Sequence, residues 1–388
     1  MIQFIAILLL AAILYTVQRI IYMKLWARNL EVDIHFEGKE IFEGERGRLV
    51  ETITNSKRLP LPMIKCKFLT SRNLMFDNAT RNQNTDNYYR NDVFTIGGRE
   101  KLTRTIAFTA GRRGLYNITS AELVGTDMFF TLESVLMKKI YDEIYVLPRP
   151  FNTSEFRNSL QWINGEIKSK AHLIEDPFEF RGIREYQPYD SMKSINWKAT
   201  AKTGDLRVNM RDFTSQKVVR IFLNLEDTGI IKRTEAQEAA IKVAAGLVKS
   251  FTNEDMEFAL YSNGVDVLSG QPIKIKRSRG KVHEQEIYRA LARIDLKQDT
   301  EEMTKLFSDT IEAGDGTMCD YHISVNSYDE YQRLLENYDS IHMSFLWLYV
   351  TSGAEILGIS SRLQTRTIPI RSWSYATNAE IDLNKDNT

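Results

Sequence analysis

The residues best able to contact a charged partner lie between positions 181 and 211. This stretch holds seven Lys or Arg against three Asp or Glu, in a chain whose formal net charge is zero. Aromatic residues stand between the cations, and an arginine can bind a carboxylate or phosphate through two hydrogen bonds. We expect Arg181 and Arg184 to make such contacts, with Tyr186 and Trp197 as rigid anchors. The alternative is a linker in which Trp197 is buried and the cations are merely solvated.

The chain lacks the sequence patterns of common catalytic sites. It contains no phosphate-binding loop, no G-x-G-x-x-G fingerprint and no G-x-S-x-G nucleophile elbow. None of the five histidines pairs with another at the i, i+4 spacing of zinc proteases. The two cysteines, Cys66 and Cys319, are too few for a disulfide scaffold or a thiolate zinc cluster. We therefore predict a protein that is not an enzyme, with no small-molecule substrate and no bound cofactor.

Charge composition argues against a nucleic-acid partner. Lys and Arg total 51, and Asp and Glu also total 51, whereas a dedicated nucleic-acid binder carries a clear basic excess. Two local basic stretches, the segment 181–211 and the loop from Lys274 to Lys281, leave open a contact with a polyanion. An anionic lipid surface is the most natural partner for them.

The first residues predict a membrane anchor. Ile2 to Gln18 carries no formal charge, and the apolar character resumes at Ile20 after a single arginine. A helix of about 20 apolar residues spans a bilayer. The alternative is a cleaved signal peptide, but no basic residue precedes Arg19 and no small-x-small cleavage site follows. Because Arg19, Lys24 and Arg28 lie on the C-terminal side, we expect a single-pass protein of the cell membrane with its bulk in the cytoplasm.

Residues 30–150 predict a β-sandwich of short antiparallel strands. Leu30–Phe36 alternates apolar and polar residues, and Gly-rich turn signals separate further runs of strand length. Asn73–Asp92 is dense in polar residues, and we expect it to be an exposed loop. Pro148–Arg149–Pro150 closes this domain. The other expected strands are Leu49–Ile53, Met63–Leu69, Leu102–Phe108, Ser120–Leu123 and Glu143–Leu147.

From residue 216 the pattern becomes α/β. Val218–Leu225 reads as a buried strand, and a continuous apolar stripe from Ala236 to Phe251 predicts a helix. Thr234 and Gln237 are placed to form a capping box at its start. Asn263–Gly264 predicts a hairpin turn. Further helices are expected at Val282–Ile294, Thr300–Ile311 and Asp329–Asn337, and further strands at Tyr321–Val325, Phe345–Val350 and Thr365–Ile370. This alternation predicts a mostly parallel sheet covered on both faces.

The sequence G-I-R-E-Y-Q-P-x-D, followed by I-N-W-K-A-T-A-K-T-G, resembles the signature of the Domain of Unknown Function 58 family. The similarity extends upstream through Arg113–Gly114–x–Tyr116 and downstream into the α/β part. The chain departs from the family at Tyr189, where a glycine is usual, and in having one expected membrane span rather than two. The matching residues are Gly182, Arg184, Tyr186, Asp190, Ile195, Asn196, Trp197 and Ala199.

The resemblance implies a β-sandwich followed by a von Willebrand factor type A-like domain, and no enzymatic activity. It also implies a MoxR-type AAA+ ATPase as partner, and hence an adaptor role in the assembly or maturation of other proteins. On this basis we expect a partner to contact residues within the signature segment, which we define as residues 151–215. These residues are Arg181, Gly182, Arg184, Tyr186, Asp190, Asn196, Trp197 and Lys198.

A second hypothesis is a metal-dependent ligand-binding module. Von Willebrand type A domains often hold Mg²⁺ through D-x-S-x-S after the first strand, where hard oxygen ligands gather on one loop. Here the matching positions are Asn224, Glu226 and Thr228, with Asp227 between them. Because a neutral amide replaces the first carboxylate, the site is degenerate, and a simple turn is the alternative.

The expected fold class is therefore multidomain α+β. It comprises an N-terminal transmembrane helix, an antiparallel β-sandwich and an α/β von Willebrand factor A-like domain with a mostly parallel sheet. The expected boundaries are 1–28 for the anchor and its flank, 30–150 for the sandwich, 151–215 for the signature segment, 216–375 for the α/β domain and 376–388 for a polar tail.

Overall fold

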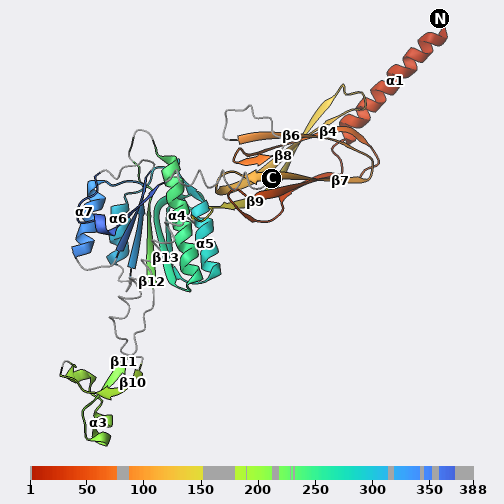
Figure 1. Cartoon of the computed structure of the whole chain (residues 1–388). Helices are drawn as coiled ribbons and strands as arrows, with labels where there is room; N and C mark the ends of the chain where they lie inside the picture. Colours follow the sequence, from red (N-terminus) through yellow and green to blue (C-terminus); the bar gives the residue numbers. More distant parts are fainter. Residues whose placement is uncertain are drawn as a thin grey trace, which may run out of the picture. The chain divides into compact units, whose positions relative to one another are not determined.

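A computed structural model describes the greater part of the chain as an α+β protein with an N-terminal apolar helix (Figure 1). The chain divides into two compact units, Met1–Arg149 and Pro150–Thr388. Each unit is described separately below, and the tail expected at 376–388 lies outside the described residues. These are 2–76, 87–151, 180–188, 190–211, 218–227, 229, 232–312, 319–340, 345–351 and 358–371.

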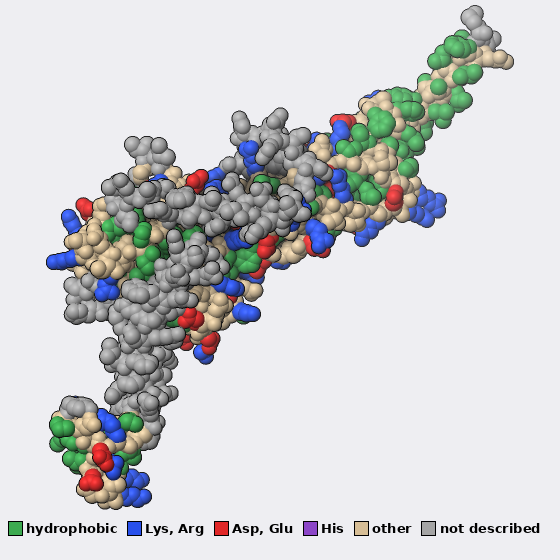
Figure 2. Space-filling model, viewed as in Figure 1, with side chains coloured by type: hydrophobic (Ala, Val, Ile, Leu, Met, Phe, Trp, Pro, Cys, Tyr) green, Lys and Arg blue, Asp and Glu red, His purple; other side chains and the backbone are tan. Residues whose placement is uncertain are grey.

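Helix α1 (Ile2–Leu25) opens the first unit and exceeds the predicted uncharged run. Within it, Gln3–Leu25 is long and apolar enough to cross a membrane, a property that a signal sequence shares. Figure 2 shows hydrophobic side chains along this helix. Near its C-terminal end, Tyr22 and Trp26 are buried in the core of the β-rich body, so the end of α1 is part of that body.

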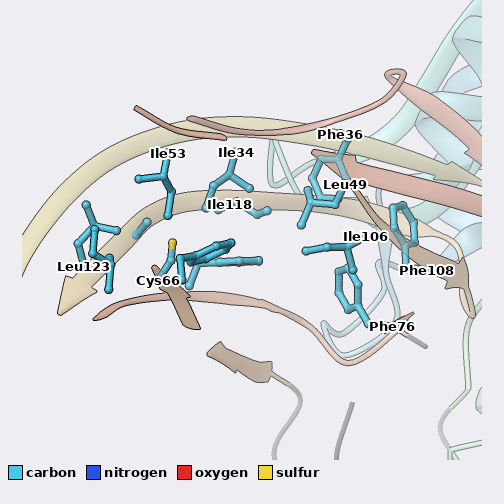
Figure 3. Packing of buried hydrophobic residues seen from close by; sticks show 14 of the residues in the cluster. Ile34, Phe36, Leu49, Ile53, Cys66, Phe76, Ile106, Phe108, Ile118 and Leu123 are labelled. Carbon is cyan, nitrogen blue, oxygen red and sulfur yellow. The ribbon is translucent and has the colours of Figure 1, made fainter. Parts of the chain in front are cut away.

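The β-rich body of the first unit consists of two sheets. One has the strand order β1-β3-β7-β5 and the other β2-β9-β8-β4-β6, and both are antiparallel apart from the parallel pair β2 and β9. Their inward-facing residues form one core, part of which Figure 3 shows from Ile34 and Phe36 to Phe108. The strands are β1 (Leu30–Phe36), β2 (Glu40–Phe42), β3 (Arg46–Asn55), β4 (Leu61–Ser71), β5 (Leu74–Phe76), β6 (Asn87–Ile96), β7 (Glu100–Ala110), β8 (Gly114–Thr126) and β9 (Glu133–Leu147).

The expectation of an exposed loop over Asn73–Asp92 is wrong at both ends, where β5 and β6 form. The error came from reading polar residues as solvated. Arg90 and Asp92 are both buried, and the Arg90 guanidinium binds the Asp92 carboxylate at 2.5 and 3.1 Å. Arg104 on β7 also donates to Asp92, at 2.9 Å. Because each charge has a partner, these residues can lie inside a strand pair.

The second unit contains an α/β sheet with the strand order β14-β13-β12-β16-β17-β18. The pairs from β13 to β18 along this order are parallel, whereas β14 and the short β15 pair antiparallel with β13, so the expected parallel sheet is found only in part. The strands are β12 (Val218–Asn224), β13 (Glu257–Asp266), β14 (Pro272–Ser278), β15 (Ile294–Asp295), β16 (Cys319–Ser324), β17 (Phe345–Thr351) and β18 (Thr367–Arg371).

Helices cover both faces of this sheet, with α4 and α5 on one side and α6 and α7 on the other (Figure 1). On the side of α6 and α7, the core is largely aromatic and includes Phe222, Phe307 and Trp347. A short 3₁₀ turn, η2 (Gln364–Arg366), precedes β18. The helices are α4 (Thr234–Asn253), α5 (Lys281–Ala292), α6 (Met303–Glu312) and α7 (Asp329–Ser340).

Two local predictions for this unit are wrong. Thr234 does not cap α4, whose N-cap is Arg233 without a side-chain cap bond; Gln237 instead donates from Nε2 to the Leu225 carbonyl at 2.7 Å. Asn263–Gly264 lies inside β13 rather than in a hairpin turn. The pairing of β13 with β14 shifts between Ser262 and Val265, so these residues form an irregularity within the strand.

Candidate functional site

The described part of the signature segment forms a small motif of its own. Strand β10 (Phe180–Glu185) pairs antiparallel with β11 (Arg207–Arg211), and the 3₁₀ turn η1 (Met192–Ser194) and helix α3 (Trp197–Thr203) lie between them in sequence. Ile195 forms an isolated bridge with Val208, and both side chains are buried. These two residues supply the apolar contact that holds the helix-bearing connection to the strand pair.

Arg184 and Asp190 bind each other rather than standing apart. The Arg184 guanidinium donates to the two Asp190 oxygens at 2.6 and 2.5 Å, and the Gln187 amide donates to Asp190 Oδ2 at 2.9 Å. The hydrogen bond from Arg184 holds the pKa of Asp190 below its usual value, with a smaller opposing effect of burial. Two predicted binding residues therefore close the turn after β10 together.

Asn196 also has a role within the motif. Its Oδ1 accepts a hydrogen bond from the Ala199 amide at 2.9 Å, which caps α3, and its Nδ2 donates to Asn209 Oδ1 at 2.6 Å. Its backbone amide donates to the Arg207 carbonyl at 2.7 Å. These bonds fix the first turn of α3 against β11, and so they fix the position of the next residue, Trp197.

Trp197 is 64% exposed. Within the described motif this tryptophan is not buried, because Ile195 and Val208 occupy the interior instead. The adjoining Lys198 is exposed as well. Other exposed apolar side chains in the motif are Ile183, Met192 and Leu206.

The remaining predicted residues of this segment are less informative. Gly182 lies at an irregularity in the pairing of β10 with β11. Tyr186 is half-buried, and its amide donates to the Leu206 carbonyl at 2.9 Å. The side chain of Arg181 lies outside the described part of the structure. Trp197 with Lys198 is thus the part of the predicted site that the described structure presents most openly to solvent.

The loop after β12, where the sequence predicts a possible metal site, is held by hydrogen bonds to neighbouring parts of the chain. Asn224 Oδ1 accepts hydrogen bonds from the Glu226 amide and from Asn263 Nδ2, both at 3.0 Å. Asn263, fully buried in β13, also accepts from the Leu225 amide at 2.8 Å and donates to the Glu301 carbonyl at 3.0 Å. Sequence reasoning missed this asparagine because it was assigned to a turn.

The two carboxylates of the same loop differ: Asp227 is paired with the partly exposed Arg233, whereas Glu226 lies near other acids. Burial raises the pKa of Asp227, but hydrogen bonds from Arg233 outweigh it and lower the pKa below the usual value. Arg233 donates to Asp227 from its amide at 2.7 Å and from Nη2 at 3.1 Å. Burial raises the pKa of Glu226, and the charges of Glu302 and Glu330 raise it further.

The described residues of this loop lend no support to a metal site. Thr228 lies outside the described residues, and Asp227 is committed to Arg233. Across the described ranges, no group of three or more His, Cys, Asp or Glu is placed to hold a metal ion. Nothing in the described loop favours the metal-dependent alternative over the turn.

A buried polar network lies deeper in the α/β sheet. Arg220 on β12 binds both oxygens of Asp320 on β16 at 2.8 Å, and the Tyr338 hydroxyl contacts both residues. His322 Nδ1 lies 2.8 Å from the Tyr331 hydroxyl, and burial lowers the pKa of His322 to about 3, so the ring is neutral. Every member is enclosed, which makes this network a structural element of the core rather than an open site.

The basic loop has a structural explanation. Its cations lie on and just after β14, the antiparallel edge strand of the sheet, and the exposed side chains include Lys274 and Lys276. Lysines on an edge strand discourage pairing with the edge strands of other molecules. Their positions therefore require no polyanion.

Comparisons with known proteins give no family. No family model matches the chain, and no curated protein matches it. Among solved structures, the chain is similar to the CARDB domain of a Pyrococcus furiosus protein at 14% identity, over 31% of this chain and 90% of that one, with a TM-score of 0.20. A type I cohesin from Pseudobacteroides cellulosolvens matches at 10% identity, over 31% and 96%, with a TM-score of 0.20. These likenesses are too remote to assign a fold or a function.

Proposed function

We propose that this protein is a membrane-anchored, non-catalytic interaction protein that binds its partner through Trp197 and the adjoining part of the signature segment. The observation that carries the proposal is that Trp197 is exposed while other residues make the contacts within the described motif. Ile195 and Val208 fill the interior, Arg184 is committed to Asp190, and Asn196 caps the helix. A tryptophan left 64% exposed on a fixed helix is the type of residue that dominates binding energy at protein interfaces.

The anchor in this proposal is α1, inserted once in the cell membrane with the bulk of the chain in the cytoplasm. Its length and apolar character support the insertion, and Arg19, Lys24 and Arg28 on its C-terminal side support the orientation. The partner we propose is a MoxR-type AAA+ ATPase, on the resemblance of the signature segment to the Domain of Unknown Function 58 family. This family would also imply a von Willebrand factor A-like domain. The parallel strand pairs of the second unit, and the helices on both faces of its sheet, support that part of the proposal.

Site-specific photocrosslinking in native membranes tests the proposal. A photoreactive amino acid replaces Trp197 in one sample and Leu268 in the other. Leu268 is a matched control because it is also 64% exposed, on the turn between β13 and β14. We expect a crosslinked AAA+ ATPase from position 197 and none from position 268. Absence of the ATPase at 197, or equal yields at both positions, would overturn the proposal.

A further inference from the structure

The loop between β8 and β9 presents three consecutive large apolar residues to solvent. Met128 is 55% exposed, Phe129 is 60% exposed and Phe130 is 59% exposed. Consecutive exposed apolar residues are unfavourable in a soluble protein unless they serve a function. An exposed apolar patch of this kind marks a contact with a protein or a membrane.

The loop is held in one conformation. Asp127, which is 1% exposed, accepts hydrogen bonds from the Thr131 amide at 2.6 Å, the Thr131 hydroxyl at 2.7 Å and the Leu132 amide at 3.0 Å. Phe130 has a φ of 59°, in the left-handed region that non-glycine residues seldom adopt. The apolar side chains are thus displayed by a fixed turn, at the cost of an unfavourable backbone conformation.

The same loop is bonded to α1. Gln18 Nε2 donates to Asp127 Oδ2 at 3.1 Å, and the Tyr15 hydroxyl donates to Thr131 Oγ1 at 3.0 Å. The rings of Tyr15 and Phe129 lie 5.9 Å apart between centroids. Met128, Phe129 and Phe130 therefore lie beside the second half of the apolar helix, and their exposed surface continues that of α1.

The part of α1 that contacts the loop lies within the candidate membrane span. These contacts, at Tyr15 and Gln18, lie within Gln3–Leu25, the stretch that is long and apolar enough to cross a membrane. At 1.5 Å per residue this stretch is about 34 Å long. The hydrocarbon core of a bilayer is about 30 Å thick. A membrane that this stretch spans therefore also covers the helix at Tyr15 and Gln18, at the level where the apolar loop lies.

Cations lie at the next level along the same end of the unit. The Tyr22 hydroxyl donates to the Pro60 carbonyl at 3.0 Å, which brings the turn between β3 and β4 against α1. Arg58 on this turn and Arg99 on the neighbouring turn are both exposed, and the Arg99 amide donates to the Lys57 carbonyl at 2.8 Å. Figure 2 shows blue Lys and Arg side chains around the end of the unit from which α1 emerges. Apolar residues followed by cations match the order of acyl chains and anionic headgroups.

We propose that Met128–Phe130 is a second membrane contact, whose three side chains insert into the interfacial layer of the bilayer beside α1. The occupant of this patch is lipid, with anionic headgroups against Arg58 and Arg99. Bound in this way, the loop fixes the depth and tilt of the β-rich body at the membrane. The inference rests on the proposed anchorage through α1, and its test separates the two.

The test places a fluorescent probe at single introduced cysteines in the full chain, reconstituted in vesicles of phosphatidylcholine and phosphatidylglycerol. The native Cys66 and Cys319 are buried and are shielded from labelling in the folded protein. Phe129→Cys reports on the loop and Leu10→Cys on the helix. Met137→Cys is the matched control, because Met137 is 61% exposed on β9, about 13 Å along the strand from Glu133.

Quenching by nitroxide-labelled lipid and by aqueous iodide then locates each probe. We expect the probe at 129 to follow the probe at 10, with strong quenching by lipid and protection from iodide, and the probe at 137 to behave in the opposite way. A probe at 129 that follows position 137, while position 10 is in lipid, overturns the loop contact and leaves the anchor intact. If position 10 is also quenched by iodide, both the anchor and the loop contact are wrong.

Discussion

In the α/β sheet, Trp347 is fully buried and donates from Nε1 to Ser324 Oγ at 2.7 Å, whereas Trp197 in the signature segment is 64% exposed. The two regions also differ in their arginine–aspartate pairs. Arg220 and Asp320 are 2% and 1% exposed, while Arg184 is 35% exposed in its pair with Asp190. In the sheet, the large side chain of Trp347 and the charged pair Arg220–Asp320 are therefore buried and stabilise the fold. In the described part of the signature segment, by contrast, Ile195 and Val208 are buried and Trp197 is left exposed to solvent.

The largest difference should appear when the two ion pairs are broken. Asp320→Ala leaves the Arg220 charge buried without its carboxylate, which costs about 3–5 kcal/mol. Asp190→Ala leaves Arg184 able to reach water, so its effect should be much smaller. Thermal unfolding of the full chain in detergent, followed by circular dichroism, measures both. Equal losses of thermal stability would contradict the contrast between the two regions.

The two tryptophans give a second matched pair. Trp347→Ala removes a fully buried ring and should cost about 3–5 kcal/mol. Trp197→Ala removes a surface side chain and should change the free energy of unfolding by less than about 0.5 kcal/mol. Chemical denaturation followed by circular dichroism compares them. A loss at Trp197 comparable to that at Trp347 would mean that the indole is part of a core.

The β-sandwich also contains a buried carboxylate, that of Glu51. Unlike Asp320, which binds Arg220, Glu51 forms no ion pair with an arginine in the described structure. Glu51 is 1% exposed, and burial raises its pKa to about 7, while the neighbouring Cys66 thiol lowers it by less. Arg90 and Arg104 bind Asp92 instead. Because the folded-state pKa is raised, the native protein holds a proton that the unfolded chain releases between about pH 4.5 and 7.

The contribution of Glu51 to stability should therefore be fully present below about pH 4.5 and should decline as the pH rises to about 7, by on the order of 3 kcal/mol. Glu51→Gln should remove this decline, and the exposed Glu31→Gln should preserve it. Melting temperatures across this pH range measure the effect. A profile that Glu51→Gln leaves unchanged would show that Glu51 is not the titrating group.

The smallest expected effect is at the cap of α3. Asn196→Ala removes the acceptor for the Ala199 amide and should cost about 1 kcal/mol, whereas Asn196→Ser should retain most of the cap. Hydrogen exchange of the α3 amides measures the change locally. Faster exchange in the alanine variant alone is the expected result, and equal exchange in both variants would show that the cap does not hold α3.

The positions of helices and strands could be predicted largely from the spacing of apolar residues along the sequence. Leu30–Phe36 is a strand over the predicted residues, and the apolar stripe from Ala236 to Phe251 lies within α4. The errors came from polar residues with partners far away in sequence. Asn263 was assigned to a turn although it binds residues after β12, and Arg90 and Asp92 were assigned to a loop although they neutralise each other inside a strand.

The candidate site was predictable in its residue types but not in its arrangement. The sequence indicated that Arg184, Asp190, Asn196 and Trp197 belong together. It could not show that Arg184 and Asp190 bind each other or that Ile195 occupies the interior in place of Trp197. Which of several apolar residues is buried depends on the pairing of β10 with β11, and a single sequence does not encode that pairing in any short pattern.

The most direct test of the central claim compares the wild type and Trp197→Ala in quantitative pull-downs from native membranes, with melting temperatures measured on the same preparations. Truncation of an anchor residue costs at least about 2 kcal/mol of binding energy, which is roughly thirtyfold in affinity. The account predicts that the variant loses the AAA+ ATPase while its melting temperature stays that of the wild type. Undiminished recovery of the ATPase by the variant, or recovery that falls together with its melting temperature, would contradict it.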